Sequence, residues 1–179
     1  MIRSFIALLA LSTLCIPQVD ASKASDPIQF FTDSELVRAG ADPGLVATVA
    51  AANVPVIKGD ETFAFCNRDG FITRAGYNTV VNAIIICLNH STPETIAPSF
   101  THEAVHLAQD CKAGLHNEHL LASSPVSVRN IWDHGLTEAQ RESIKRSYTP
   151  DEWDFETEAF YFQNHPSVVQ QEVATFCFA

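Results

Sequence analysis

The best strand candidate in the chain is the apolar stretch at residues 83–88, which read Ala-Ile-Ile-Ile-Cys-Leu. A short run this rich in β-branched residues predicts a strand. Apolar segments at 54–57, 62–66 and 71–77 predict further strands, with a turn at 67–70 between the last two. The first contains Pro55, which is tolerated at a sheet edge. The pattern therefore predicts a small, mainly antiparallel sheet with meander connections.

Helical patterns lie on both sides of these segments. Residues 34–39 and 43–53 predict two helices before the sheet, with glycines as punctuation. After the sheet, Thr92-Pro93-Glu94 is a typical helix start. Pro98 is expected to kink or restart this helix, and a helix over 99–111 follows, which Gly114 can end. Capping patterns at Thr137 and Thr149 predict helices to about residues 147 and 164, and a last helix covers 168–176. The fold class expected is α+β: a small antiparallel sheet packed on the helix at 99–111, followed by a mainly helical C-terminal half.

The first 21 of the 179 residues have the pattern of a secretory signal peptide. Arg3 supplies the positive charge, residues 5–16 the apolar core, and Val19-Asp20-Ala21 a small-residue cleavage site. Residues 22–179 are then expected to form one domain of a secreted or periplasmic protein. No later segment is long and apolar enough to cross a bilayer. The formal net charge of −10, without a basic patch, argues against nucleic acid as a partner.

Four cysteines follow the expected cleavage site. An even number in an exported domain predicts two disulfides, and three pairings are possible. We favour Cys66–Cys87, which would join neighbouring strands, and Cys111–Cys177, which would tie the C-terminus to the helix at 99–111. A cysteine-containing metal site is the alternative, but the chain has no Cys-x-x-Cys pair.

The helix at 99–111 contains the pattern His102-Glu103-Ala-Val-His106. Residues four apart share a helix face, so the two imidazoles can meet one metal ion. Glu103 lies beside that face, where its carboxylate can take a proton from water at the metal. The pattern predicts a zinc site with Glu103 as general base. The alternative is two surface histidines on an amphipathic helix.

A catalytic zinc usually has three protein ligands. A third histidine six residues after His106 is ruled out, because Lys112 stands there. A glutamate from the late aromatic helix is the other common choice. Glu156 has Trp153, Ala159 and Phe160 as helical neighbours, whereas Glu158 lies on a face that we expect to be wetter. A carboxylate on an apolar face needs a cation, so Glu156 is preferred to Glu158.

The pattern His-Glu-x-x-His followed by Glu156-x-x-Ala159 resembles the gluzincin branch of the zincin metallopeptidases. The resemblance implies Zn²⁺ held by His102, His106 and Glu156, catalysis by Glu103, and a peptide substrate antiparallel to an edge strand near residues 83–88. Asp does not follow Ala159, as it does in several of those families, so the choice between Glu156 and Glu158 stays open.

The remaining polar residues offer several supporting roles. Asp110 is one possible partner for a zinc-bound histidine. Asn89-His-Ser fits a glycosylation acceptor pattern. A donor to the reacting oxygen is also needed, and five residues are unranked candidates for it: His116, His119, His134, Tyr148 and Tyr161. The function expected is that of an exported zinc metallopeptidase acting on a peptide or protein. Two alternatives remain, a zinc-binding interaction domain without turnover and a disulfide-stapled secreted domain with an accidental motif.

Overall fold

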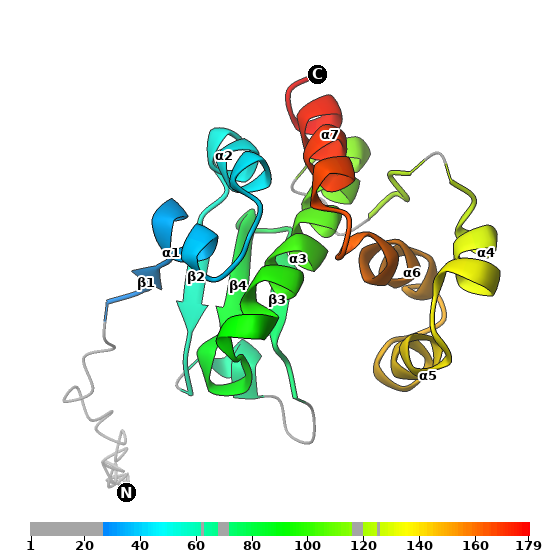
Figure 1. Cartoon of the computed structure of the whole chain (residues 1–179), viewed down its shortest axis with the longest axis horizontal. Helices are drawn as coiled ribbons and strands as arrows, with labels where there is room; N and C mark the ends of the chain where they lie inside the picture. The colour runs from blue at the N-terminus through cyan, green and yellow to red at the C-terminus, as the bar shows by residue number, and fades with distance from the viewer. Residues whose placement is uncertain (1–26, 62, 68–71, 116–119, 125) are drawn as a thin grey trace, which may run out of the picture.

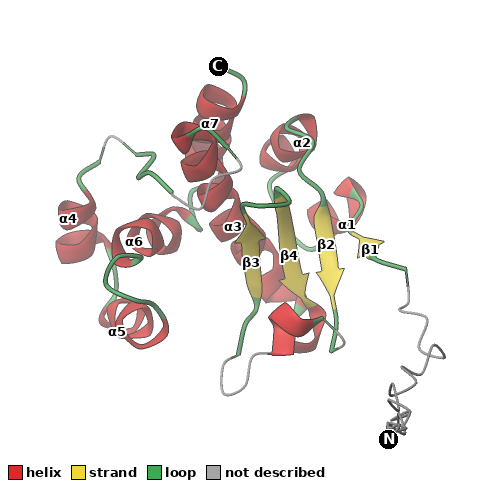
Figure 2. Cartoon of the chain, turned by 180° about the vertical axis from the view of Figure 1, so that it is seen from behind, coloured by secondary structure: helices red, strands yellow, loops and turns green. Residues whose placement is uncertain are grey.

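A computed structural model describes residues 27–61, 63–67, 72–115, 120–124 and 126–179. Its centre is a four-stranded sheet with one long helix, α3 (Pro93–Ala113), packed across one face (Figures 1 and 2). The expected α+β class is confirmed. The expected signal peptide lies outside the described residues.

The sheet is mixed, which corrects the expected antiparallel meander. Its strands are β1 (Gln29–Phe30), β2 (Val56–Gly59), β3 (Ala75–Asn78) and β4 (Ala83–Cys87), in the order β1-β2-β4-β3. β2 runs parallel to β4, while β1 and β3 run antiparallel to their neighbours. The segment with Pro55 is therefore not at an edge. Proline is tolerated because Pro55 precedes β2 and its carbonyl accepts a hydrogen bond from the N–H of Ile84 (3.0 Å).

β4 occupies the centre because every one of its residues is apolar and buried. Ile84 and Ile86 face α3 and the main core, whereas Ile85 and Cys87 face a smaller cluster on the other side of the sheet. β4 pairs with β2 on one side and with β3 on the other. The edge strand beside residues 83–87 is β3, which pairs antiparallel with β4.

The predicted strand at 62–66 is also wrong. Residues Ala64–Asn67 form a 3₁₀ helix, η1, and the returning strand is shortened to β3. Cys66 is bonded to Cys87, which confirms this predicted disulfide and holds η1 against the sheet. Gly59 of β2 leaves room for that bond, because a Cβ there would lie 2.6 Å from Sγ of Cys66.

A single helix runs through Pro98, so the expected restart does not occur. Proline removes one intrahelical hydrogen bond, a loss that the packing of a 21-residue helix can offset. Gly114 ends α3 in the left-handed conformation (φ 105°), as expected. The predicted disulfide Cys111–Cys177 is confirmed and ties α7 (Pro166–Cys177) to the end of α3.

The other helices surround this framework. α1 (Asp33–Arg38) and α2 (Pro43–Ala51) lie near β1 and β2, and η2 (Leu88–His90) follows β4. Beyond the β3 edge lie α4 (Val128–Asn130), the π-helical turn η3 (Ile131–Gly135), α5 (Glu138–Ser147) and α6 (Trp153–Phe162) (Figure 2). The capping box predicted at Thr137 is confirmed. Within the described residues, no helix combines the length and the apolar character needed to cross a membrane.

Candidate metal centre

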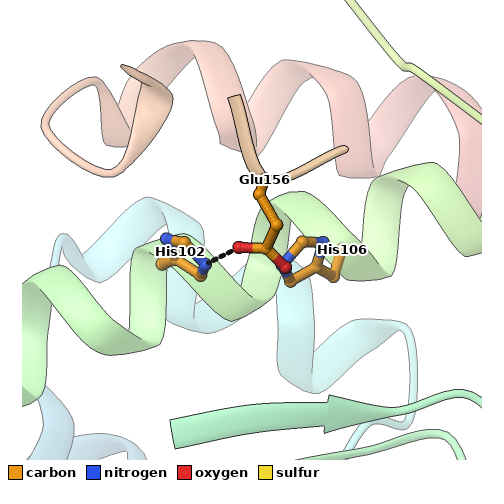
Figure 3. A group of neighbouring side chains, drawn as sticks. All are labelled: His102, His106 and Glu156. Carbon is orange, nitrogen blue, oxygen red and sulfur yellow. Dashed lines mark ion pairs between the residues drawn. The ribbon is translucent and has the colours of Figure 1, made fainter. Parts of the chain in front are cut away.

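Three buried side chains from two helices converge at one point. His102 and His106 come from one face of α3, and Glu156 comes from the first turn of α6 (Figure 3). Nε2 of His102 lies 3.3 Å from Oε2 of Glu156, and Nε2 of His106 lies 3.3 Å from Oε1. One ligand atom from each residue lies within 4.8 Å of the others. The group could hold a metal ion, and Glu158 is not part of it.

The local sequence explains why α6 can approach α3. Thr157 and Ala159 are small and buried, which allows close contact between the helices. The ring of Phe160 packs edge-on against His102, with ring centroids 4.9 Å apart. These contacts leave each histidine with Nε2 directed at the carboxylate of Glu156.

The electrostatics of the group favour a cation. Burial opposes the charge of Glu156, but attraction to His106 and His102 outweighs it and lowers the pKa of this carboxyl well below its usual range. Burial likewise lowers the pKa of His106, but Glu156 and then Glu103 raise it to about 9.

A metal ion fits this donor set. Oε2 of Glu156 is buried, and its contact with Nε2 of His102 at 3.3 Å is an ion pair without hydrogen-bond geometry. A buried carboxylate oxygen without a donor is costly unless a cation meets it. Two imidazole nitrogens and one carboxylate are a common ligand set for zinc in catalytic sites. The residues present therefore fit a divalent ion.

Glu103 lies beside the three residues and is only 5% exposed. Burial raises the pKa of its carboxyl, and the nearby His102 and His106 oppose this effect. The backbone N–H of Tyr77, on the edge strand β3, donates a hydrogen bond to it. The carboxylate is thus held between α3 and the sheet edge.

Glu158 is fully buried, so the expectation of a wetter face was wrong. It accepts hydrogen bonds from the N–H groups of Ser123 (2.8 Å) and Ser124 (3.0 Å). Its third donor is Nε2 of Gln109 (2.9 Å). The segment 120–124, distant in sequence, covers the face that would otherwise be open to water.

Gln109 is the polar neighbour of the site that the sequence reasoning missed. Its Oε1 lies 2.8 Å from Nδ1 of His106. Its position three residues after His106, on the same helix face, is a signal that could have identified it. Asp110, which we considered for this role, instead accepts a hydrogen bond from the Tyr77 hydroxyl (2.8 Å).

Among the candidate donors to a reacting oxygen, Tyr148 lies near the site. Burial, together with the charges of Glu156 and Glu103, raises the pKa of its hydroxyl. Tyr161 packs against Phe162 and His165, and His134 is exposed in η3. His116 and His119 lie outside the described residues.

A family model described as a domain of unknown function (DUF8637) matches residues 56–178, and the chain belongs to this family. The matched region contains β2 to α7, with all three residues of the candidate metal centre. No curated protein and no solved structure matches the chain.

Proposed function

We propose that this DUF8637 protein is an exported, zinc-dependent hydrolase that cleaves peptide bonds. The observation that carries the proposal is the carboxylate of Glu156 seated between Nε2 of His102 and Nε2 of His106. Two disulfides also support export, because such bonds persist in oxidising compartments.

His102, His106 and Glu156 would hold the zinc. When bound, zinc supplies a Lewis acid that polarises a carbonyl group and makes a nearby water molecule more acidic. The three protein ligands leave room for a water or a substrate. The resemblance to gluzincins points to the same ligand set.

Glu103 would act as the general base. A metal centre without turnover would not need this carboxylate, which is held by the Tyr77 N–H beside the two histidines. In the proposed reaction, Glu103 accepts a proton from water and then donates it to the leaving amine. The raised pKa of this buried carboxyl suits proton transfer nearer neutral pH than an ordinary glutamate allows.

Tyr148 would stabilise the developing charge on the carbonyl oxygen. Its hydroxyl stays protonated at working pH, because burial raises its pKa. Its hydroxyl hydrogen-bonds to Glu156 and lies near Glu103, so it would be placed to donate to the carbonyl oxygen once Glu156 holds the zinc.

The proposal is tested by metal analysis of the purified protein and by peptide cleavage. We expect about one zinc per chain in the wild type, and we expect the Glu103→Gln variant to keep the zinc while losing cleavage. Glu152→Gln is a matched control, because it changes an exposed glutamate in the N-cap of α6.

Each outcome separates one alternative. A wild-type protein without stoichiometric zinc would make the His-Glu-x-x-His pattern accidental. A protein that holds zinc but cuts no member of a broad peptide library would instead be a zinc-binding domain without turnover.

A further inference from the structure

A buried polar network extends from the metal centre through Gln109. This side chain is 0% exposed and bridges α3 to α6. Its Oε1 lies 2.8 Å from Nδ1 of His106. At the other end, Nε2 donates to Oε2 of Glu158 (2.9 Å) and to the carbonyl of Phe155 (3.2 Å).

The chemistry of these partners fixes the orientation of the amide. A backbone carbonyl can only accept hydrogen bonds. Both carboxyl oxygens of Glu158 already accept from backbone N–H groups, so Glu158 is an acceptor here as well. The end of Gln109 that faces them must be its NH₂ group, and its carbonyl oxygen must face His106.

The orientation of the amide in turn fixes the proton on His106. A carbonyl oxygen accepts but never donates, so Nδ1 of His106 must carry a hydrogen. In the neutral ring, Nε2 is then the nitrogen with a free lone pair. Nε2 is the atom that faces Glu156.

We propose that Gln109 and Glu158 are positioning residues that set the tautomer and ring orientation of His106, so that its Nε2 is presented to the metal. This inference rests on the proposed metal centre and extends it to two residues outside the ligand set. α6 would then contribute in two ways. Glu156 is a metal ligand, and Glu158 orients the ligand His106 on α3 through Gln109. The backbone of Ser123 and Ser124 anchors the network at its far end.

The first test compares two Glu→Gln variants that contact the same segment. Glu158→Gln removes the carboxylate that Gln109 needs. Glu172→Gln alters a buried acid that accepts from the Ser123 hydroxyl (2.7 Å) and, within the described part of the chain, is hydrogen-bonded to none of Gln109, Glu158 and His106. Zinc affinity is measured by competition with a chromophoric chelator. We expect about a 10–100-fold loss for Glu158→Gln, the usual effect of removing a group that orients a ligand, and less than about a twofold change for Glu172→Gln.

The second test exchanges the two partners of the Gln109–Glu158 bond. Gln109→Glu alone brings two carboxylates face to face and should weaken zinc binding. Adding Glu158→Gln removes the repulsion between the two carboxylates and leaves an oxygen at position 109 to accept from His106. The bond to the Phe155 carbonyl and one bond from Ser123 or Ser124 are still lost, so only partial recovery is expected. The double variant should therefore bind zinc at least about fivefold more tightly than Gln109→Glu, because neighbours in one network are not additive.

Circular dichroism of the metal-free variants and the visible spectrum of their Co²⁺ forms accompany both tests. A folded Glu158→Gln protein with altered Co²⁺ bands supports a role at the metal. Unchanged zinc affinity in Glu158→Gln, an equal loss in Glu172→Gln, or no recovery in the exchange variant would overturn the inference while leaving the metal centre intact. A wild type that binds no zinc would overturn both.

Discussion

The disulfide between Cys111 and Cys177 should contribute a large share of the stability of this fold. It joins the end of α3 to the end of α7 across a sequence separation of 66 residues. In the chain-entropy model, closing a loop of this length lowers the entropy of the unfolded chain and stabilises the native state by about 4 kcal/mol. A domain of this size has a total stability of roughly 5–15 kcal/mol, so reduction of this bond alone should be plainly measurable.

The bond can be tested without changing any side chain around it. In a Cys66→Ala/Cys87→Ala background, Cys111–Cys177 is the remaining described disulfide, and oxidised and reduced forms of one variant differ only in that bond. Urea unfolding in the presence of a chelator gives the free energy of unfolding of each form. We expect the reduced form to be less stable by about 4 kcal/mol.

A difference below about 1 kcal/mol would refute the reasoning. It would mean that the ends of this loop already stay close in the unfolded chain, or that the native contacts between α3 and α7 do not need the bond. Mass spectrometry of the oxidised form, with and without thiol alkylation, confirms that the bond is present before the comparison is made.

Three further predictions follow from the site and its surroundings. The metal-free protein should lose stability as pH rises from about 6.5 to about 9, because folding raises the pKa of His106 to about 9 and the folded state therefore binds this proton more tightly than the unfolded state does. Thermal unfolding with and without zinc checks this, and a loss of stability that zinc does not diminish would contradict it. Tyr77→Phe should cost about 1.5–3 kcal/mol in urea unfolding, because its hydroxyl donates to the buried Asp110; a cost equal to that of Tyr161→Phe would contradict it. Tyr148→Phe should lower kcat about 100-fold or more while zinc affinity changes little, since it removes a donor to the reacting oxygen. Steady-state kinetics measures kcat and chelator competition measures zinc affinity. An unchanged kcat would exclude Tyr148 as that donor.

The features that could be predicted from the sequence are those set by local spacing. The pattern of His102 and His106 needs only one helical turn, and the apolar neighbours of Glu156 indicated that this glutamate meets the two histidines. The two disulfides followed from cysteines placed in or beside predicted elements. These predictions depend on residues that are near one another in the chain or on small numbers of possible pairings.

The features that could not be predicted depend on contacts between distant segments. Glu158 has charged and aromatic helical neighbours, and its burial comes from the distant segment 120–124 and from Gln109. β4 pairs in parallel with β2 and so lies between β2 and β3, although β3 comes between β2 and β4 in the sequence. The apolar pattern of each strand alone does not show this order. The shift of Ala64–Asn67 from strand to 3₁₀ helix likewise occurs where Cys66 bonds to the sheet.

The central claim is that His102, His106 and Glu156 enclose one divalent ion. Anomalous scattering at the zinc absorption edge, from crystals of the protein purified without added chelator, tests this most directly. The account predicts one peak about 2.0–2.2 Å from Nε2 of both histidines and from a carboxylate oxygen of Glu156. A zinc peak bound elsewhere, or none in a fully folded protein supplied with zinc, would contradict it.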